Sequence, residues 1–265
     1  MLALIDDFDA STADIADEID VSGAACLKAV VTEEWLREAQ ECVRSYLPSN
    51  GRHEVFIEDP AADEYSFVHR LVIDPRLESL MESLAVASYP ALGADGRGIE
   101  SAIRILVGPG EPGKPLWFHY DRSVVSMVVP IIIPNVGSRI SGELVLCPNR
   151  RPYRRSVITN IIEKFVAQSD FYRRRFVRKL DDEVDAKVIP LQPGNAYVFW
   201  GYRTYHATFP CADDALRVTV LVHYGNVHGR NNALLAAQWL FRRVRGLQQK
   251  LSSAAAEAPT HNAVR

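Results

Sequence analysis

The chain has 265 residues, 48% of them hydrophobic and 24% charged, and its 33 acidic and 30 basic residues leave a formal net charge of -3. This composition is typical of a soluble globular protein and excludes a wholly basic, nucleic-acid-directed chain. The amino terminus carries acidic residues where a secretory signal has basic ones, and the most apolar stretch, 124–133, is too short to span a bilayer. Four cysteines without CxxC spacing favour reduced thiols. We therefore expect a cytoplasmic protein with neither a membrane nor a nucleic acid as partner.

The first hundred residues predict mainly helices. Thr32 precedes two glutamates and a series of apolar residues at helical spacing, so it is expected to cap a helix that ends before Pro48. Asp74 and Pro75 predict the start of a second helix, with leucines on one face. The segment between them, 52–65, is rich in loop-forming residues and gives no clear assignment.

From Ile99 onward the pattern changes to short apolar runs separated by Gly and Pro, which predict strands. The expected strands are 102–107, 116–121, 124–133 as a buried pair, 142–147, 186–191, 196–200 and 216–224. Such a series predicts an all-β sandwich or barrel with helices packed outside. A helical segment over 156–180 interrupts the strands and carries an apolar face, and a second helix is expected over 233–251 on the outside of the barrel. Residues 252–265 lack apolar periodicity and predict a disordered tail.

The most informative motif is His119-Tyr120-Asp121. In an extended strand side chains alternate, so His119 and Asp121 point to the same face and can bind one ion together. With a second histidine from elsewhere they form the 2-His-1-carboxylate triad, which leaves coordination positions open on Fe(II). The alternative interpretation of the motif is a histidine that is hydrogen-bonded within the core.

A second histidine and an arginine follow at longer range. His206 lies just beyond the end of the strand expected at 196–200. Further on, Arg217 and Thr219 share one face of an otherwise apolar strand. A guanidinium in such a strand requires an acidic partner, because Arg is rarely buried unpaired. That partner is either a bound carboxylate or an Asp or Glu of the chain.

The sequence contains four motif elements in this order: His119-x-Asp121, the strand beginning at Pro193, His206 and Arg217-x-Thr219. Together they resemble the Fe(II)/2-oxoglutarate-dependent dioxygenases, and most of all their phytanoyl-CoA dioxygenase-like branch. The resemblance implies His119, Asp121 and His206 as iron ligands and Arg217 and Thr219 as the site for the distal carboxylate of 2-oxoglutarate. It implies O2 as a further cosubstrate and the release of succinate and CO2. The expected reaction is oxidation of an unactivated C–H bond of a small molecule in specialised metabolism. Hydroxylation is the expected outcome, and desaturation and cyclisation are the alternatives.

The same resemblance implies a fold that is mainly β with flanking helices, built on a double-stranded β-helix, a jelly-roll or cupin-like core. The core spans about 99–228, a helical insertion spans about 150–182, and both belong to a single domain of residues 1–251. Two rival functions are a cupin-like metal enzyme that uses no 2-oxoglutarate and a jelly-roll binding protein without turnover. The sequence does not predict the oligomeric state.

Three weaker candidates surround the expected site. Arg104 precedes the motif on a strand and is expected either to meet a substrate or cosubstrate carboxylate or to form a structural ion pair. Trp117 and Trp200 are each expected either to line the substrate pocket or to pack in the core. His69, His223 and His228 have no partner at a suggestive spacing and are interpreted as structural or surface residues.

The near neutrality of the chain conceals an uneven charge distribution. Between Arg150 and Leu180 there are ten basic and two acidic residues, which gives the insertion a charge of +8 and leaves -11 for the rest. A positive insertion near the barrel mouth is expected to attract an anionic substrate or an acidic carrier protein. The alternative interpretation is a solvated helix face.

Overall fold

The structure is a computed structural model that describes residues 3–5, 11–46, 54–92, 98–109, 116–154, 156–180 and 184–228. The chain divides into two units, Met1–Val227 and His228–Arg265, and the described residues before His228 all belong to the first. The helix expected over 233–251 and the tail expected over 252–265 lie outside the described residues.

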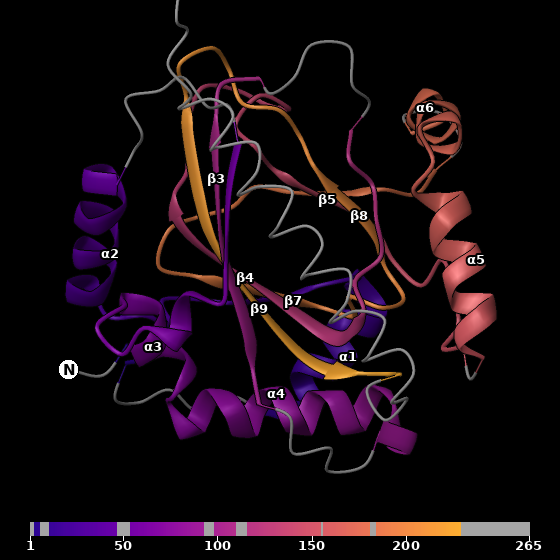
Figure 1. The fold of residues 1–265 in the computed structure, drawn as a ribbon, viewed down its shortest axis with the longest axis horizontal. Coiled ribbons are helices and arrows are strands. Elements are labelled where there is room, and N and C mark those ends of the chain that lie inside the picture. The colour runs from indigo at the N-terminus through magenta and orange to yellow at the C-terminus, as the bar shows by residue number, and fades with distance from the viewer. Residues whose placement is uncertain are drawn as a thin grey trace, which may run out of the picture. The chain divides into compact units, whose positions relative to one another are not determined.

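Two antiparallel sheets make up the centre of the first unit (Figure 1). A six-stranded sheet has the order β1-β7-β4-β9-β3-β2, and a three-stranded sheet has the order β6-β5-β8. The strands are β1 (Ala25–Leu27), β2 (Glu54–Glu58), β3 (Glu100–Val107), β4 (Ser123–Ile132), β5 (Leu144–Cys147), β6 (Lys187–Ile189), β7 (Ala196–Phe199), β8 (Tyr205–Thr208) and β9 (Leu216–Asn226). The helices are α1 (Thr12–Ser22), α2 (Glu33–Tyr46), η1 (Pro60–Ala62), α3 (Phe67–Val72), α4 (Pro75–Ser88), η2 (Pro90–Leu92), α5 (Val157–Ala167) and α6 (Asp170–Arg178). The predicted class, mainly β with flanking helices, is confirmed.

Side-chain alternation along the strands separates the layers. On β4, Met127 packs into the large core between the six-stranded sheet and the helices, whereas its neighbour Val128 packs against residues of the three-stranded sheet. On β9, Val220 likewise packs into the large core, and its neighbour Leu221 packs on the side of the three-stranded sheet. The outer face of the three-stranded sheet is covered in turn by α6, through Phe176. Figure 1 shows α2 and α3 on one side of the strands and α5 and α6 on the opposite side.

Both predicted helix starts are confirmed by their capping hydrogen bonds. The Thr32 hydroxyl accepts from the Trp35 N–H at 3.2 Å, and the Asp74 carboxylate accepts from the Arg76 N–H at 3.0 Å. The structure adds elements that the sequence did not assign: α1, α3, β1 and, within the segment 52–65, the edge strand β2. No described helix has the length and apolar character required to cross a membrane. All four cysteines are free in the structure.

Three strand predictions differ from the structure. The expected strand pair at 124–133 is one strand, β4, which continues past Pro130 because the ladder with β9 shifts register there. The segment 116–121 forms no ladder beyond an antiparallel bridge between His119 and His206. His206 itself lies within β8, since the chain turns at 201–204 and resumes pairing with β5 at Tyr205.

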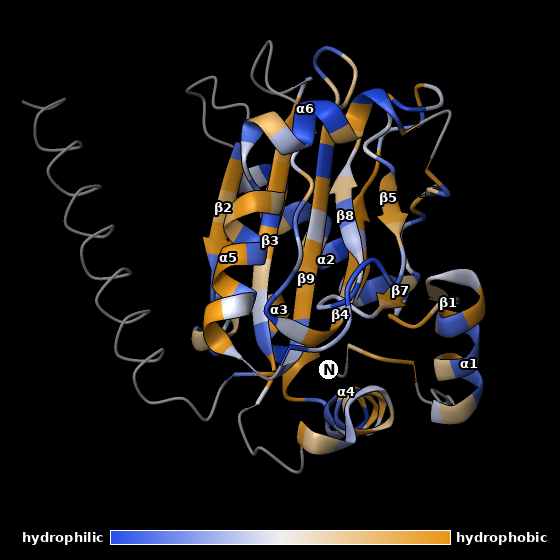
Figure 2. Cartoon of the chain, turned by 90° about the vertical axis from the view of Figure 1, so that its right-hand side faces the viewer, coloured by the Kyte–Doolittle hydropathy of each residue, from blue (hydrophilic) through white to orange (hydrophobic). Residues whose placement is uncertain are grey.

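The predicted helical insertion consists of two helices, and the first of them exposes its apolar face. Ser169 caps a new helix by accepting from the Tyr172 N–H, so the segment 156–180 is split into α5 and α6. The apolar face of α5 faces solvent: Ile158 is 71% exposed and Phe165 is 81% exposed (Figure 2). The opposite face, which carries buried Asn160, lies against the rest of the protein. Amphipathic spacing defines two faces of a helix but does not determine which of them is buried.

Candidate metal centre

His119, Asp121 and His206 converge, as the motif predicts. The bridge between the two histidines consists of reciprocal backbone hydrogen bonds of 2.9 and 3.0 Å, and it places their imidazole centroids 4.3 Å apart. His119 Nε2 lies 3.5 Å from Asp121 Oδ1, and His206 Nε2 lies 3.5 Å from Asp121 Oδ2. One donor atom from each residue therefore lies within 4.8 Å of the others.

Hydrogen bonds to the backbone fix which ring nitrogen of each histidine faces the site. His119 Nδ1 lies 3.0 Å from the Trp117 carbonyl oxygen, and His206 Nδ1 lies 3.0 Å from that of Thr204. A carbonyl oxygen only accepts, so each Nδ1 carries the proton and each Nε2 presents a lone pair to the site. Backbone carbonyls thus orient both imidazoles as ligands.

The charges of the three groups also suit a cation. Burial lowers the pKa of His206 to about 4, so its imidazole is neutral at pH 7. For Asp121, burial acts to raise the pKa, but the imidazoles of His206, His223 and His119 hold it well below its usual range. Two imidazole nitrogens and one carboxylate are the donor set of the 2-His-1-carboxylate iron site, so these residues fit Fe(II).

A serine and a further histidine support Asp121 from inside the barrel. The Ser126 hydroxyl donates to Asp121 Oδ2 at 2.5 Å and lies 3.0 Å from His223 Nδ1. Gly201 allows this close approach, because a Cβ there would lie 2.0 Å from Ser126 Oγ and 2.8 Å from Asp121 Oδ2. Sequence reasoning interpreted His223 as structural or surface. The available signal was alternation along β9, which puts His223 on the same face as Arg217 and Thr219.

Arg217 and Thr219 lie on that interior face of β9, where Arg217 is 1% exposed and Thr219 is fully buried. Arg217 Nε donates to the Gly142 carbonyl at 2.8 Å, and Nη1 donates to Thr219 Oγ1 at 3.3 Å. Burial, with Arg104 nearby, lowers the pKa of Arg217 to about 9, which still leaves it charged at pH 7. Across the described ranges no Asp or Glu forms an ion pair with it. A buried guanidinium without an acidic partner is suited to a carboxylate ligand.

Gly142 is required where it contacts Arg217. Its φ is +71°, and an added Cβ would lie 2.3 Å from Arg217 Cδ. Glu143 shapes the same turn, because its carboxylate accepts from the Arg139 and Ser141 N–H groups. The turn therefore holds the carbonyl that orients Arg217.

The weaker candidates are placed as follows. Arg104 lies opposite Thr219 in the ladder, but its Nε pairs with Glu54 at 2.8 Å, the structural ion pair considered from the sequence. Trp117 is 56% exposed, so it is not a core residue, and the Arg173 guanidinium lies 3.7 Å from the centre of its ring.

Trp200 does not face the candidate site. It packs into the helix-side core, and its indole N–H donates to Asp20 Oδ1 at 2.8 Å. Alternation along β7 places its neighbour Phe199 on the inner face instead, with the ring 4.9 Å from that of His206. The expectation that Trp200 lines the substrate pocket is therefore wrong, and Phe199 is the aromatic residue beside the distal histidine.

Two buried arginines of the insertion, Arg151 and Arg173, form what we call the arginine brace. The segment 116–121 lacks a strand neighbour on one edge, so its carbonyls need other donors. Arg173 Nε donates to the Phe118 carbonyl at 2.9 Å, and Arg151 Nη2 donates to the Asp121 carbonyl at 3.3 Å. These two basic residues are structural, and neither belongs to a solvated helix face.

Arg151 also reaches the segment that leads to His206. Its Nε donates to the Tyr202 carbonyl at 2.6 Å and its Nη1 to Asn160 Oδ1 at 2.9 Å. The guanidinium lies between two rings, 4.2 Å from the centre of Tyr120 and 3.9 Å from that of Tyr202. A single side chain thus connects both ligand-bearing segments to α5.

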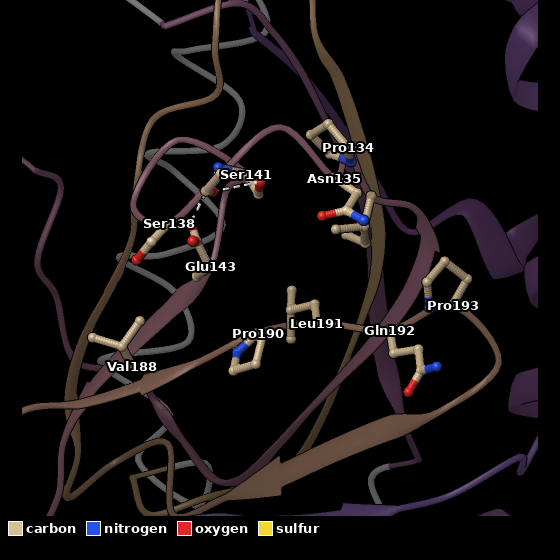
Figure 3. A pocket seen from close by; sticks show the side chains of 12 residues that line it. Pro134, Asn135, Ser138, Ser141, Glu143, Val188, Pro190, Leu191, Gln192 and Pro193 are labelled. Carbon is tan, nitrogen blue, oxygen red and sulfur yellow. Dashed lines mark hydrogen bonds between the residues drawn. The ribbon is translucent and has the colours of Figure 1, made fainter.

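A separate cavity of about 690 Å³ opens between segments 133–143 and 188–193 (Figure 3). Its wall includes Ser141 and Glu143, which hydrogen-bond each other in the turn that orients Arg217. None of the three converging residues lines it. We therefore do not assign the metal centre to this cavity.

No protein-family model matches the sequence, and no curated protein matches it. Solved structures do. The carbocyclase SnoK from nogalamycin biosynthesis, described as non-heme and alpha-ketoglutarate-dependent, matches with a TM-score of 0.56 at 12% identity over 89% of this chain and 93% of its own. The alpha-ketoglutarate-dependent epimerase SnoN matches with a TM-score of 0.55 at 15% identity, covering 81% and 83%. HygX from Streptomyces hygroscopicus, solved with nickel and 2-oxoglutarate, matches with a TM-score of 0.54 at 12% identity, covering 82% and 88%.

The chain has the fold of the 2-oxoglutarate-dependent oxygenases. The predicted jelly-roll core is thereby confirmed. At 12–15% identity these structures show the fold alone and do not distinguish the phytanoyl-CoA branch from others. The roles of individual residues follow from the geometry above.

Proposed function

We propose that this protein is a non-haem Fe(II)- and 2-oxoglutarate-dependent oxygenase that hydroxylates an unactivated C–H bond of a small molecule. The observation that carries the proposal is the convergence of two oriented histidine Nε2 atoms on the two oxygens of Asp121. The solved neighbours support it, since SnoN is described in complex with Fe3+ and alpha-ketoglutarate and HygX with nickel and 2-oxoglutarate.

Each residue has a distinct task in this proposal. His119, Asp121 and His206 hold the iron, and the Arg217 guanidinium with the Thr219 hydroxyl binds the distal carboxylate of 2-oxoglutarate. Bound Fe(II), with 2-oxoglutarate and O2, supplies the oxidising chemistry, and succinate and CO2 are the coproducts. Nearby protein groups keep the ligands oriented: two backbone carbonyls fix the imidazoles, and Ser126 fixes the carboxylate.

The two rival functions explain fewer of these observations. A cupin-like enzyme without 2-oxoglutarate has no use for a buried guanidinium that lacks an acidic partner among the described residues, whereas a dicarboxylate cosubstrate requires one. A binding protein without turnover has no need for a complete triad whose histidines are both oriented by backbone carbonyls.

The wider setting follows from the same sources. SnoN and SnoK are described as enzymes of nogalamycin biosynthesis, which supports a role for this chain in specialised metabolism. SnoK is described as a carbocyclase, which supports cyclisation as an alternative to hydroxylation. Product analysis has to separate hydroxylation from cyclisation and from desaturation. Four free cysteines support a reducing compartment, the cytoplasm.

Succinate formation tests the proposal. The full-length protein is incubated with Fe(II), 2-oxoglutarate and O2 across a panel of small molecules, and succinate is measured for wild type, Asp121→Ala and Arg217→Met. We expect substrate-dependent succinate in the wild type, none in Asp121→Ala, and a raised KM for 2-oxoglutarate in Arg217→Met. Undiminished turnover in Asp121→Ala would refute the ligand assignment. Product formation that needs iron but no 2-oxoglutarate would establish the cupin-like rival.

A further inference from the structure

Lys164 lies on the face of α5 that is directed toward the metal centre. Asn160 and Ala167 are the buried residues of this helix, and Lys164 shares their face because it follows Asn160 by four residues and precedes Ala167 by three. The opposite face is the exposed apolar one that includes Ile158 and Phe165. The helix therefore directs its only lysine inward.

Hydrogen bonds show how close that face is to the iron ligands. Asn160 Oδ1 accepts from Arg151 Nη1 at 2.9 Å and from the Tyr202 hydroxyl at 3.1 Å. Arg151 in turn donates to the carbonyl of Asp121. One side chain thus separates Asn160 from a proposed ligand, and Lys164 lies four residues, roughly 6 Å of rise, further along the same face.

The ammonium of Lys164 lies near charged groups of the proposed metal centre and of the segments beside it. Asp121, Arg151 and Arg122 are the charged groups that act on it, and burial with the two guanidiniums lowers its pKa to about 8. At pH 7 it is mainly protonated. The two described ion pairs of the insertion join Arg154 to Glu163 and Arg173 to Asp170, so neither provides Lys164 with a counterion.

The neighbouring charged groups already have partners. Arg151 donates to three acceptors, Arg122 pairs with Glu100, and Asp121 belongs to the proposed triad. A recessed ammonium without a counterion is costly, and a bound anion relieves that cost. Of the insertion's cations that have no ion-pair partner among the described residues, Lys164 is the one placed to reach a ligand at the metal centre.

We propose that Lys164 binds an anionic group of the substrate, a carboxylate or a phosphate, while the metal centre oxidises another part of the same molecule. The inference rests on the proposed function for the identity of the reaction. The anion site itself rests on the geometry of α5.

Three probes of equal chain length test the anion site: hexyl phosphate, hexanoate and 1-hexanol. Their binding to the full-length protein is measured calorimetrically at pH 7 with Fe(II) and 2-oxoglutarate under anaerobic conditions. The variants are Lys164→Met, Lys164→Arg and a matched control, Lys187→Met, which removes the same charge from β6, where Lys187 pairs with Asp185. A urea unfolding curve for each variant establishes that it is folded.

We expect at least one of the anions to bind wild type about tenfold or more tightly than 1-hexanol, as a charge-assisted hydrogen bond implies. The preference should disappear in Lys164→Met, return largely in Lys164→Arg and persist in Lys187→Met. The tighter anion identifies the headgroup. Equal affinity of all three probes for wild type, or an undiminished preference in Lys164→Met, would overturn the proposal.

Repeating the titration with metal-free protein separates this proposal from the proposed function. When 2-oxoglutarate is absent, Arg217 is accessible and can also bind an anion. Such binding does not depend on Lys164, so it persists in Lys164→Met and is distinguished from binding at Lys164. A Lys164-dependent preference in a protein that does not bind 2-oxoglutarate supports the anion site and refutes the oxygenase assignment. A protein that binds 2-oxoglutarate normally but shows no Lys164-dependent preference for the anions supports the oxygenase assignment and refutes the anion site.

Discussion

Replacing Arg151 by methionine tests whether the insertion stabilises the iron-ligand segments. Arg151 is buried, with an exposed fraction of 4%. The substitution keeps an unbranched side chain of similar length but removes the guanidinium. The carbonyls of Asp121 and Tyr202 and the amide oxygen of Asn160 then lose a donor. The variant therefore disturbs both segments that carry the proposed ligands.

The size of the effect follows from these contacts. Each of the three hydrogen bonds contributes about 1 kcal/mol net. Contacts with two tyrosine rings contribute about 0.5–1 kcal/mol each. Removing a buried charge returns part of its desolvation cost, which offsets some of the loss. We expect the free energy of unfolding to fall by about 3 kcal/mol, a large share of the roughly 5–15 kcal/mol that stabilises a typical domain.

Urea unfolding of the metal-free protein measures the loss, and an anaerobic Fe(II) titration measures its consequence for the site. Fe(II) affinity should fall with stability because the Asp121 carbonyl is no longer held. Arg154→Met is the matched control: its guanidinium also belongs to the insertion but pairs with Glu163 in a part-exposed position, so both measurements should stay at wild-type values. An Arg151→Met protein with wild-type stability and wild-type Fe(II) affinity would refute the role of the brace.

Four further predictions concern the cosubstrate, the ligands and the anion site. Arg217→Met should weaken 2-oxoglutarate binding by about 10- to 100-fold in calorimetry with little change in Fe(II) affinity, and equal affinity would contradict the anchor. Gly142→Ala should also raise the Kd for 2-oxoglutarate, because a Cβ 2.3 Å from Arg217 Cδ displaces the guanidinium; an unchanged Kd contradicts this. Gly201→Ala should weaken Fe(II) binding, since its Cβ would lie 2.8 Å from Asp121 Oδ2, and a normal titration argues against that contact. Affinity for the preferred hexyl anion should fall as the pH rises through about 8, where Lys164 loses its proton, whereas a wild-type affinity that is constant from pH 7 to 9.5 rules this out.

Residues that follow strand alternation were predictable from the sequence. The spacing of His119 and Asp121, and of Arg217 and Thr219, requires only that each segment be extended, and the structure places each pair as expected. The same alternation along β9 places His223 on the face that carries Arg217 and Thr219. Alternation also distinguishes Phe199, which faces the site, from Trp200, which faces the helices.

Features that depend on distant partners were not predictable. The strand β2 is short and none of its five side chains is fully buried, so its identity comes mainly from the ladder with β3. The orientation of α5 depends on Arg151, whose acceptors lie 30 residues before it, at Asp121, and 51 residues after it, at Tyr202. Local hydrophobic spacing contains no information about such contacts, so it does not determine which face of α5 is buried.

The most direct test of the account is an anaerobic titration of the full-length protein with Fe(II) and then 2-oxoglutarate, followed by visible absorption. If the triad holds Fe(II) and Arg217 binds the distal carboxylate, a charge-transfer band of the bidentate 2-oxoglutarate complex appears in the wild type. It should require far more 2-oxoglutarate in Arg217→Met and be absent in Asp121→Ala. A wild-type protein that binds Fe(II) but forms no band at saturating 2-oxoglutarate would contradict the central claim.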